Sequence, residues 1–426
     1  YDFGRTFSDL IQKFVDAYRP LNETYLPLYE TEAGRKIYDE TLACVEQQFP
    51  GYVKEIQGTA DGANVPFHKL FLMHLDDIVP NVANEGQGNA LPVGCSTIMC
   101  NQPGQEILGH NEDALSETLN HWYLVSAHVI EPGCKQENFT SLSYAGFLPG
   151  YTMGYNQYGL FLFSIFSDTN VHFKYTYCTI FLRFTFNSLS LSNYVQAQQI
   201  LRNEGFGAAE GFSVNMTFLM QEGDRMFHNA EVGPCEINGT QSQLSILTVS
   251  PGENTVHCNK YIFSIFLTMT FPLLSGVSNL SSSPSFFRYL RLKIPEVDGL
   301  IVDSSIKRMA AICNHPPAKC RQDVINILSD QTDDDYRVYQ EKDKDDPVKT
   351  IATGRFSNLS IFIVLSFRPI WLSLSLTNYR SNNHTNIGIF DCIERTWSIY
   401  TNKPNSTEPI LVIPLRLNGE TTVPDM

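Results

Sequence analysis

The most constraining feature of this sequence is a stretch, residues 91–113, that reads as two strands joined by a tight turn. Pro103 and Gly104 suit the centre of a four-residue turn, because Pro presets φ and Gly accepts a positive φ. We therefore predict a hairpin in which Gln102 pairs with Gln105. Helical periodicity is absent from the stretch, so the chain must form a sheet here.

This register brings together groups that suit nucleophilic catalysis. Cys95 falls opposite Glu112, one residue from Asp113, so a thiol at the head of one strand meets a carboxylate at the end of the next. Cleavage of the Gly94–Cys95 bond would leave Cys95 with a thiol and a free α-amine, whose pKa values are ordinarily about 8.5 and about 8. The amine can then act as general base for its own thiol, and Asp113 can orient it. A residue without Cβ at position 94 lets the thiol approach the carbonyl.

Two motifs in this stretch resemble a known family. Gly94-Cys95-Ser96-Thr97 followed by Gly109-His110-Asn111-Glu112-Asp113 resembles the isopenicillin N acyltransferase family of self-cleaving N-terminal-nucleophile hydrolases. The resemblance covers roughly residues 1–165, 193–260, 320–354 and 386–417. It implies a zymogen that is cut autocatalytically at Gly94–Cys95, with Cys95 as nucleophile. The alternative is that Cys95 is a small buried apolar residue, as a lone cysteine usually is.

The resemblance also implies an activity and further site residues. It implies a thiol-dependent amide hydrolase that acts on β-alanyl biogenic amines such as N-β-alanyl-dopamine or β-alanyl-histamine and needs no metal or organic cofactor. Asn259 matches the family's oxyanion asparagine, with an ordinary turn residue as the alternative, and Arg395 lies near a position where the family carries an arginine. Acyl transfer to an amine and a catalytically inactive homologue are the alternative functions.

A cationic β-alanyl end requires a carboxylate, because an unpaired buried ammonium is costly. Glu112 and Glu231 are the acidic residues nearest the motifs. By strand alternation Glu112 points away from the face that Asp113 occupies, so Glu231 is the predicted substrate-binding residue, with a surface carboxylate as the alternative.

Composition narrows the remaining function classes. The formal net charge of −15 over 426 residues argues against binding to nucleic acid or to an anionic membrane, and it suits a cationic substrate. Ten cysteines at irregular spacing predict no disulfide framework, and no cluster has the spacing of a metal site. A free nucleophilic thiol favours a reducing, cytoplasmic location. The expected partner is the protein's own cleaved N-terminal chain, in an αβ heterodimer or a higher oligomer.

The pattern of apolar residues changes at Cys95. Residues 1–75 have helical spacing, with helices expected at 36–56 and 67–79, and residues 80–94 are expected to form an exposed loop. Further on, helices are expected at 193–204 and 321–331. Strands are expected at 95–101, 106–113, 121–131, 139–145, 151–156, 159–165, 212–220, 225–231 and 243–250, and two more within 386–401.

Successive antiparallel strands predict a meander. The sequence therefore predicts an α+β protein, and the resemblance implies a four-layer αββα sandwich. Two parts are expected, a helical part at 1–94 and a catalytic core at 95–426.

Three segments depart from the rest of the chain, at residues 166–192, 261–287 and 356–379. The first is rich in Phe, Leu and Ser, the second carries no charged residue, and the third carries only Arg368; each interrupts the family resemblance. We interpret them as translated non-coding sequence or exon substitutions, with genuine insertions and membrane spans as alternatives. A transcript that retains all three, with matching protein, would exclude this interpretation.

Overall fold

The structure is a computed structural model, and it describes most of the chain. The described residues are 1–75, 94–129, 137–150, 152–167, 193–205, 207–208, 211–236, 239–259, 261–265, 291–292, 300–341, 348–350, 356–359, 361–365, 376–379 and 387–417.

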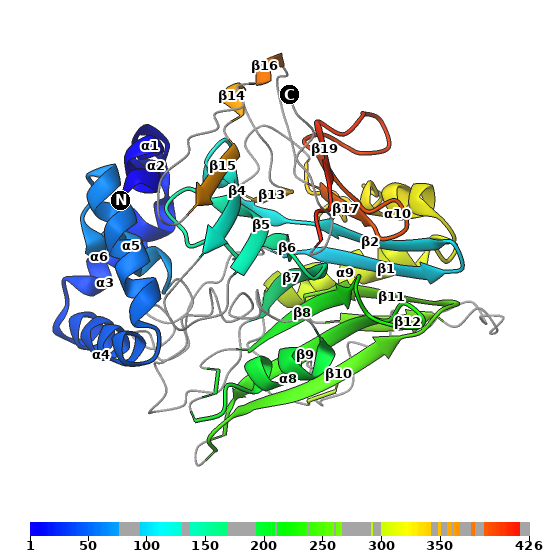
Figure 1. The fold of residues 1–426 in the computed structure, drawn as a ribbon, viewed down its shortest axis with the longest axis horizontal. Helices are drawn as coiled ribbons and strands as arrows, with labels where there is room; N and C mark the ends of the chain where they lie inside the picture. Colours follow the sequence, from blue (N-terminus) through cyan, green and yellow to red (C-terminus); the bar gives the residue numbers. More distant parts are fainter. Residues whose placement is uncertain are drawn as a thin grey trace.

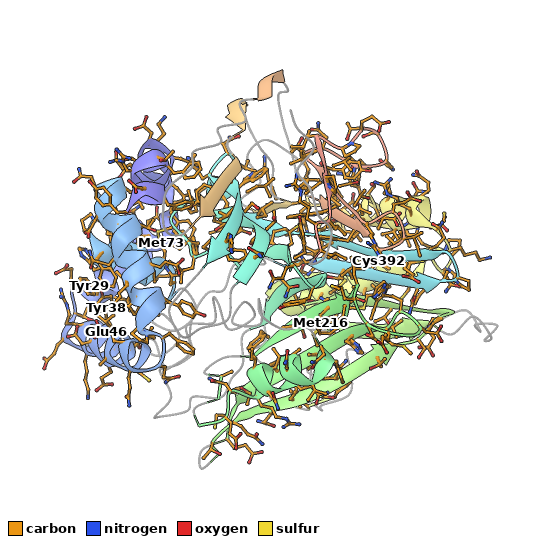
Figure 2. The ribbon with its side chains drawn as sticks, in the orientation of Figure 1. Tyr29, Tyr38, Glu46, Met73, Met216 and Cys392 are labelled. Atoms are coloured by element: carbon orange, nitrogen blue, oxygen red, sulfur yellow. The ribbon has the colours of Figure 1, made fainter. Side chains whose placement is uncertain are left out.

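Helices occupy most of residues 2–73, as predicted, and they gather on one side of the molecule (Figure 1). Their bounds are α1 (Asp2–Thr6), α2 (Ser8–Ala17), α3 (Leu26–Tyr29), α4 (Glu32–Gln48), α5 (Pro50–Ala63) and α6 (Phe67–Met73), with a π-helical turn over Pro20–Tyr25. The helix predicted at 36–56 is two helices, because Pro50 lacks the N–H that a continuing helix needs and suits a first turn instead. Tyr29 and Tyr38 pack edge to face within this group (Figure 2).

A long meander follows, which confirms that prediction. Its strands are β4 (Trp122–Val129), β5 (Glu137–Tyr144), β6 (Met153–Asn156), β7 (Leu160–Ser167), β8 (Gly211–Phe218), β9 (Phe227–Cys235) and β10 (Ser242–Val249). Each pairs antiparallel with the next, and β15 (Ile361–Leu365) adds a parallel strand beside β4. Short connections favour this order within β4–β7 and within β8–β10, whereas β7 and β8 pair across a long connection that contains a helix.

A second large sheet contains the predicted hairpin. Its strands, in spatial order, are β12 (Tyr261–Ile265), β11 (Glu253–Cys258), β1 (Ser96–Gln102), β2 (Gln105–Asn111), β17 (Ile387–Asp391), β18 (Thr396–Tyr400) and β19 (Leu411–Pro414). The predicted register is confirmed, with Gln102 opposite Gln105 and Ser96 opposite Asn111. Gly104 has φ of 74°, as the turn requires.

The sheet hydrogen bonding breaks at Glu112 and resumes in a small sheet that pairs β3 (Asp113–Leu115) with β13 (Val348–Thr350). A separate small sheet pairs β14 (Phe356–Leu359) with β16 (Leu376–Tyr379). Because the strand is interrupted at Glu112, the alternation of side chains does not continue from Asn111 to Asp113.

Three helices pack on the two large sheets. They are α8 (Tyr194–Arg202), α9 (Leu300–Cys313) and α10 (Arg321–Leu328). The helix predicted at 193–204 is α8: the Asn193 side chain accepts a hydrogen bond from the Gln196 amide at its start, and Asn203 ends it with a positive φ. In the second sheet α10 lies on β1 and β2, whereas α9, which the sequence analysis did not predict, lies on β11 and β12.

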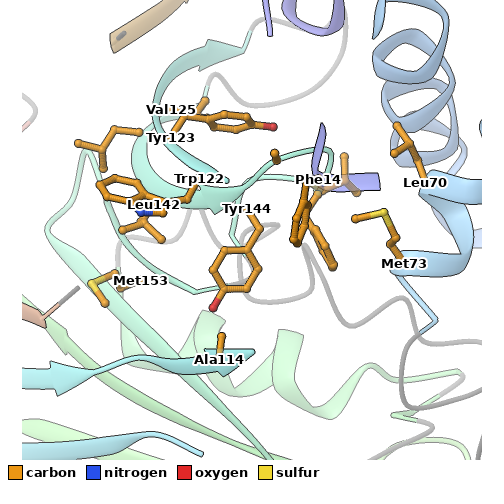
Figure 3. Packing of buried hydrophobic residues seen from close by; sticks show 14 of the residues in the cluster. Phe14, Leu70, Met73, Ala114, Trp122, Tyr123, Val125, Leu142, Tyr144 and Met153 are labelled. Carbon is orange, nitrogen blue, oxygen red and sulfur yellow. The ribbon is translucent and has the colours of Figure 1, made fainter. Parts of the chain in front are cut away.

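These elements confirm the α+β class. The largest apolar cluster joins the N-terminal helices to β4 and β5, and Figure 3 shows Tyr144 between Phe14 and Met73 on one side and Trp122 and Leu142 on the other. In the described part of the chain, none of the helices combines the length and the apolar character that crossing a bilayer requires. The three unusual segments lie largely outside the described residues, as does the predicted loop before Gly94, although Gly94 itself is buried rather than exposed.

Candidate active site

Cys95 stands at the head of β1, and only 7% of its surface is exposed. Burial raises the pKa of its thiol well above the ordinary value, and the negative charges of Glu112 and Asp113 raise it further. The main-chain amide of Asp113 donates a hydrogen bond to the sulfur, and the Arg308 guanidinium lies nearby; both lower the thiol pKa. The Cys95 sulfur therefore lies close to two negatively charged carboxylates and to one positively charged guanidinium.

The main-chain nitrogen of Cys95 is held by Asn259. It donates a hydrogen bond of 2.9 Å to Asn259 Oδ1. Asn259 follows β11 in the turn to β12 and has φ of 27°, in the region that Asn tolerates better than most residues. The predicted oxyanion residue and the nucleophile are therefore in direct contact.

Arg308 fixes this contact from the other side. It comes from α9, and its guanidinium is completely buried. Nη2 donates to Asn259 Oδ1 at 2.6 Å, and Nη1 donates to the carbonyl oxygen of Cys95 at 2.5 Å and to Ser96 Oγ at 2.8 Å. One turn earlier on the helix, Ser304 Oγ accepts from Nε at 3.1 Å. Because Asn259 Oδ1 accepts two hydrogen bonds, its amide orientation is set and Nδ2 remains the donor.

The positions of Asn259 and Arg308 leave space only for a glycine at position 94. A Cβ at this position would lie 2.4 Å from both Arg308 Nη2 and Asn259 Oδ1. Both atoms belong to hydrogen-bonded, buried side chains, so neither can move aside without breaking a contact. The close approach of these side chains to the main chain explains why a glycine precedes Cys95.

Asp113 lies in β3, beside the sulfur. Thr350 Oγ1 donates to its Oδ1 at 2.5 Å, while Oδ2 is buried without a hydrogen-bond partner among the described residues. Burial raises the pKa of Asp113 to about 8; Arg308 and the Thr350 hydroxyl oppose the rise, and Glu112 adds to it. An unpartnered carboxylate oxygen is thus available beside Cys95.

Glu112 also belongs to the site, so the expectation that it points away is wrong. Its carboxylate, the Cys95 sulfur and a His110 ring nitrogen all lie within 4.8 Å of one another. Tyr144 Oη donates to Glu112 Oε1 at 2.5 Å, and His110 Nε2 lies 3.1 Å from Oε2. The physical reason is the break between β2 and β3, which lets Glu112 and Asp113 both approach the thiol.

These three groups also define the one metal-capable cluster found among the described residues. The His110 ring is held on both sides, with Nδ1 2.8 Å from Thr97 Oγ1 and Nε2 3.1 Å from Glu112. These are hydrogen-bond distances between neighbours, and they account for the ring without a metal ion. That the enzyme needs no metal ion stays a prediction from the family resemblance.

The structure does not bring Glu231 or Arg395 to Cys95. Glu231 lies in β9, where its carboxylate binds Arg291 through an ion pair of 3.4 Å and a main-chain hydrogen bond of 3.1 Å. Arg395 is exposed in the turn between β17 and β18, next to Cys392, which Figure 2 labels. That turn lies at the Gln105 end of β2, because Asp391 pairs with Ile107 whereas Ile387 pairs with Asn111.

Sequence reasoning missed several residues that contact the site. Arg308 is the arginine that the site uses in place of Arg395, and Thr350 and Tyr144 are the partners of the two carboxylates. The residues around Arg308, Leu300–Cys313, carry apolar side chains at helical spacing, which could have revealed α9. Nothing local to Thr350 or Tyr144 reveals their partners, since each contact joins distant parts of the chain.

Comparison with known proteins identifies the family to which the chain belongs. The chain matches the family described as acyl-coenzyme A:6-aminopenicillanic acid acyl-transferase over residues 100–363. It belongs to this family of N-terminal-nucleophile enzymes, which confirms the resemblance carried by the two motifs. The matched range contains Asp113, Asn259, Arg308 and Thr350.

A particular relative is also similar over nearly the whole chain. The beta-alanyl-dopamine/carcinine hydrolase of Drosophila melanogaster is 37% identical over 423 residues, which cover 97% of this chain and 92% of that protein. This agrees with the likeness to N-β-alanyl-dopamine hydrolase (the Tan protein) that the motifs indicated. The chain is thus related to an amide hydrolase.

Proposed function

We propose that this protein is a self-cleaving cysteine amide hydrolase that acts on β-alanyl biogenic amines. One observation carries the proposal: the Cys95 nitrogen, which cleavage would convert into the α-amine, is bound by Asn259 at 2.9 Å beside the carboxylate of Asp113. The name of the Drosophila relative supports the substrate class, with β-alanyl-dopamine and carcinine as candidates.

The proposed self-cleavage uses the same groups. The Cys95 sulfur attacks the Gly94 carbonyl carbon, the C–N bond breaks, and the acyl group passes to sulfur while the nitrogen takes up a proton. Water then hydrolyses the thioester and leaves a Gly94 carboxylate and a free Cys95 thiol and α-amine. The absence of a Cβ at Gly94 lets Asn259 and Arg308 pack against the scissile bond, and the Arg308 hydrogen bonds to the Cys95 carbonyl oxygen and to Asn259 Oδ1 hold the Cys95 side of that bond in place.

Turnover repeats this chemistry on a substrate amide. The α-amine of Cys95 takes the thiol proton, the sulfur attacks the acyl carbon, and the amine product leaves with that proton. Asn259 Nδ2 donates to the developing oxyanion, a contribution typically worth about 3–4 kcal/mol, and Arg308 keeps the Asn259 amide oriented. Asp113 Oδ2 accepts from the α-ammonium. Water finally releases the acyl group as β-alanine.

Acyl transfer is the second candidate, because the family description names an acyl-transferase. The same thioester would then pass its acyl group to an amine instead of water. A catalytically inactive homologue is the third, and it would stay at full length. The two fates of the thioester differ only in the acceptor, so product analysis with an added amine distinguishes them.

We also propose the finer architecture that the family implies. Asn215 in β8 donates to Thr97 in β1, so the two large sheets face one another, while α10 covers one outer face and α8 lies against β10 on the other. This supports a four-layer αββα sandwich. The cut chains, 1–94 and 95–426, would stay together as an αβ heterodimer, without a cofactor. A reducing, cytoplasmic location suits the thiol.

The test is release of dopamine from β-alanyl-dopamine by the purified protein. Cys95→Ala should lower kcat/KM by a factor on the order of 10⁴ or more. Cys258→Ala is the matched control, because Cys258 is also a buried free thiol and lies opposite Ser96, the next residue along β1. The control should retain activity. Equal losses in the two variants, or an inactive wild type, would contradict the proposal.

A further inference from the structure

A buried carboxylate beside the nucleophile needs an explanation, because it works against the thiolate. Glu112 is 5% exposed, and its negative charge raises the pKa of the Cys95 thiol. Among the described residues, its hydrogen-bond partners are the His110 imidazole and the Tyr144 hydroxyl, and no lysine or arginine side chain pairs with it. A site that holds an anion against its own nucleophile is completed when a cation enters with the substrate.

We propose that the Glu112 carboxylate binds the ammonium group of the β-alanyl substrate and so determines its acyl specificity. This rests on the proposed function and names the residue that recognises its substrate. The acyl carbon must come within about 3–3.5 Å of the sulfur, and a charge-assisted hydrogen bond spans about 2.7–2.9 Å. Because the Glu112 carboxylate lies within 4.8 Å of the sulfur, one short acyl chain can satisfy both contacts.

Two donors hold the carboxylate in place. Tyr144 Oη donates to Oε1 at 2.5 Å, and Figure 3 shows the Tyr144 hydroxyl directed towards the strand of Ala114. Burial and the negative charge of Glu112 raise the pKa of Tyr144 well above its ordinary value, so this group stays a donor. A carboxylate has about four acceptor sites, and two protein donors leave room for an ammonium.

The second donor, His110, is oriented by a directional chain of hydrogen bonds. Arg291 can only donate, so Asn229 Oδ1 accepts from it at 2.8 Å, and Asn229 Nδ2 then donates to Asn215 Oδ1 at 2.8 Å. Asn215 Nδ2 donates to Thr97 Oγ1 at 3.2 Å, which leaves the Thr97 proton for His110 Nδ1 at 2.8 Å.

The neutral His110 ring therefore carries its proton on Nε2, where it faces Glu112. Glu231 binds Arg291 at the far end of this chain, so it orients the network from a distance. The other carboxylate at the thiol, Asp113, is the one placed for the α-ammonium of Cys95. The site then holds two carboxylates for two cations, one from the protein and one from the substrate.

The first test compares β-alanyl-dopamine with N-butyryl-dopamine, in which a methyl group replaces the ammonium. Wild type should prefer the cationic substrate in kcat/KM by about 10- to 100-fold, the usual range for a hydrogen bond to a charged group. Glu112→Gln should lower this preference at least about tenfold. Glu106→Gln, a matched change at an ion-paired glutamate near the turn end of β2 and outside this network, should keep it. Intact mass confirms that each variant is cleaved before the assay.

A second variant tests the geometry and covers failure of the first to fold. Glu112→Asp keeps the charge but withdraws it by one methylene group. It should shift the preferred acyl group from β-alanyl to γ-aminobutyryl, which is one methylene longer. A preference that survives Glu112→Gln or collapses in Glu106→Gln, or a Glu112→Asp enzyme with unchanged acyl-length preference, overturns the inference. A wild type that hydrolyses none of these amides refutes the proposed function itself.

Discussion

The two ends of the β1–β2 hairpin are made from the same strands but contain different groups. At the turn, Pro103 and Gly104 are exposed, and Arg395 is exposed in the adjacent β17–β18 turn. At the open end, Gly94 and Cys95 are buried with a completely buried arginine. This difference shows that the hairpin sets the pairing of β1 with β2, whereas other elements provide most of the side chains that contact Cys95.

The open end is reached by elements far away in the sequence. α9 provides Arg308, the turn after β11 provides Asn259, and β13 provides Thr350. Each approaches the point where β2 ends and β3 begins. Because strand pairing stops there, side chains that a continuous strand would direct to opposite faces can point to one place.

The largest contrast between the two ends should be in their arginines. Arg308→Ala removes the hydrogen bonds to Asn259 Oδ1 and the Cys95 carbonyl oxygen, so we expect kcat/KM to fall by about 100-fold or more, as when an oxyanion-hole donor is lost. Arg395→Ala, at the exposed turn, should change kcat/KM by less than about threefold. Steady-state assays of both variants measure the contrast.

A positioning role for Arg308 predicts more than a loss. Added guanidinium should restore part of the activity of Arg308→Ala, whereas it should not help an enzyme that is merely unfolded. Similar losses in both arginine variants would mean that the ends of the hairpin are not as different as the contacts indicate.

The buried carboxylate at the open end should also make stability depend on pH. Asp113 has a pKa of about 8 in the folded chain against 3.8 for the free side chain, because burial disfavours its charge. The folded state therefore binds the proton more tightly, and the free energy of unfolding falls as pH rises from about 4 to about 8. The slope from this one group is about 1.4 kcal/mol per pH unit within that window.

The measurement uses uncut Cys95→Ala protein with and without Asp113→Asn, melted between pH 4 and pH 8. The double variant should lose stability less steeply with rising pH. Cleaved wild type should resemble the double variant, because the new α-ammonium lowers the pKa of Asp113. Parallel curves for the two uncut proteins would show that Asp113 does not titrate in this range.

Local patterns in the sequence predicted much of the fold. The register from Gln102 to Ser96, the meander and the split into helices and strands all follow from turn residues and from apolar spacing. The motifs predicted the family, and Cys95, Asp113 and Asn259 lie together in the structure. These successes depend on contacts that are close in sequence or on a motif.

Other features of the fold and the site could not be predicted from local sequence patterns. Pro50 divides a helix that the apolar spacing alone makes continuous, and the break at Glu112 reverses the direction expected from alternation. Arg308 contacts Cys95 across more than two hundred residues, and no pattern near either residue indicates the other. The interpretation of residues 166–192, 261–287 and 356–379 as faulty sequence stays a prediction, although the Drosophila relative matches 97% of the chain.

The central claim is that Cys95 becomes a chain terminus, and N-terminal sequencing of the purified full-length protein tests it most directly. The account predicts two chains, with the larger beginning Cys-Ser-Thr-Ile, and a single uncut chain for Cys95→Ala. Cys100→Ala, at another buried free thiol in the same strand, should be cleaved like wild type. A folded wild-type protein that remains one chain, or one cut at another bond, would contradict the account.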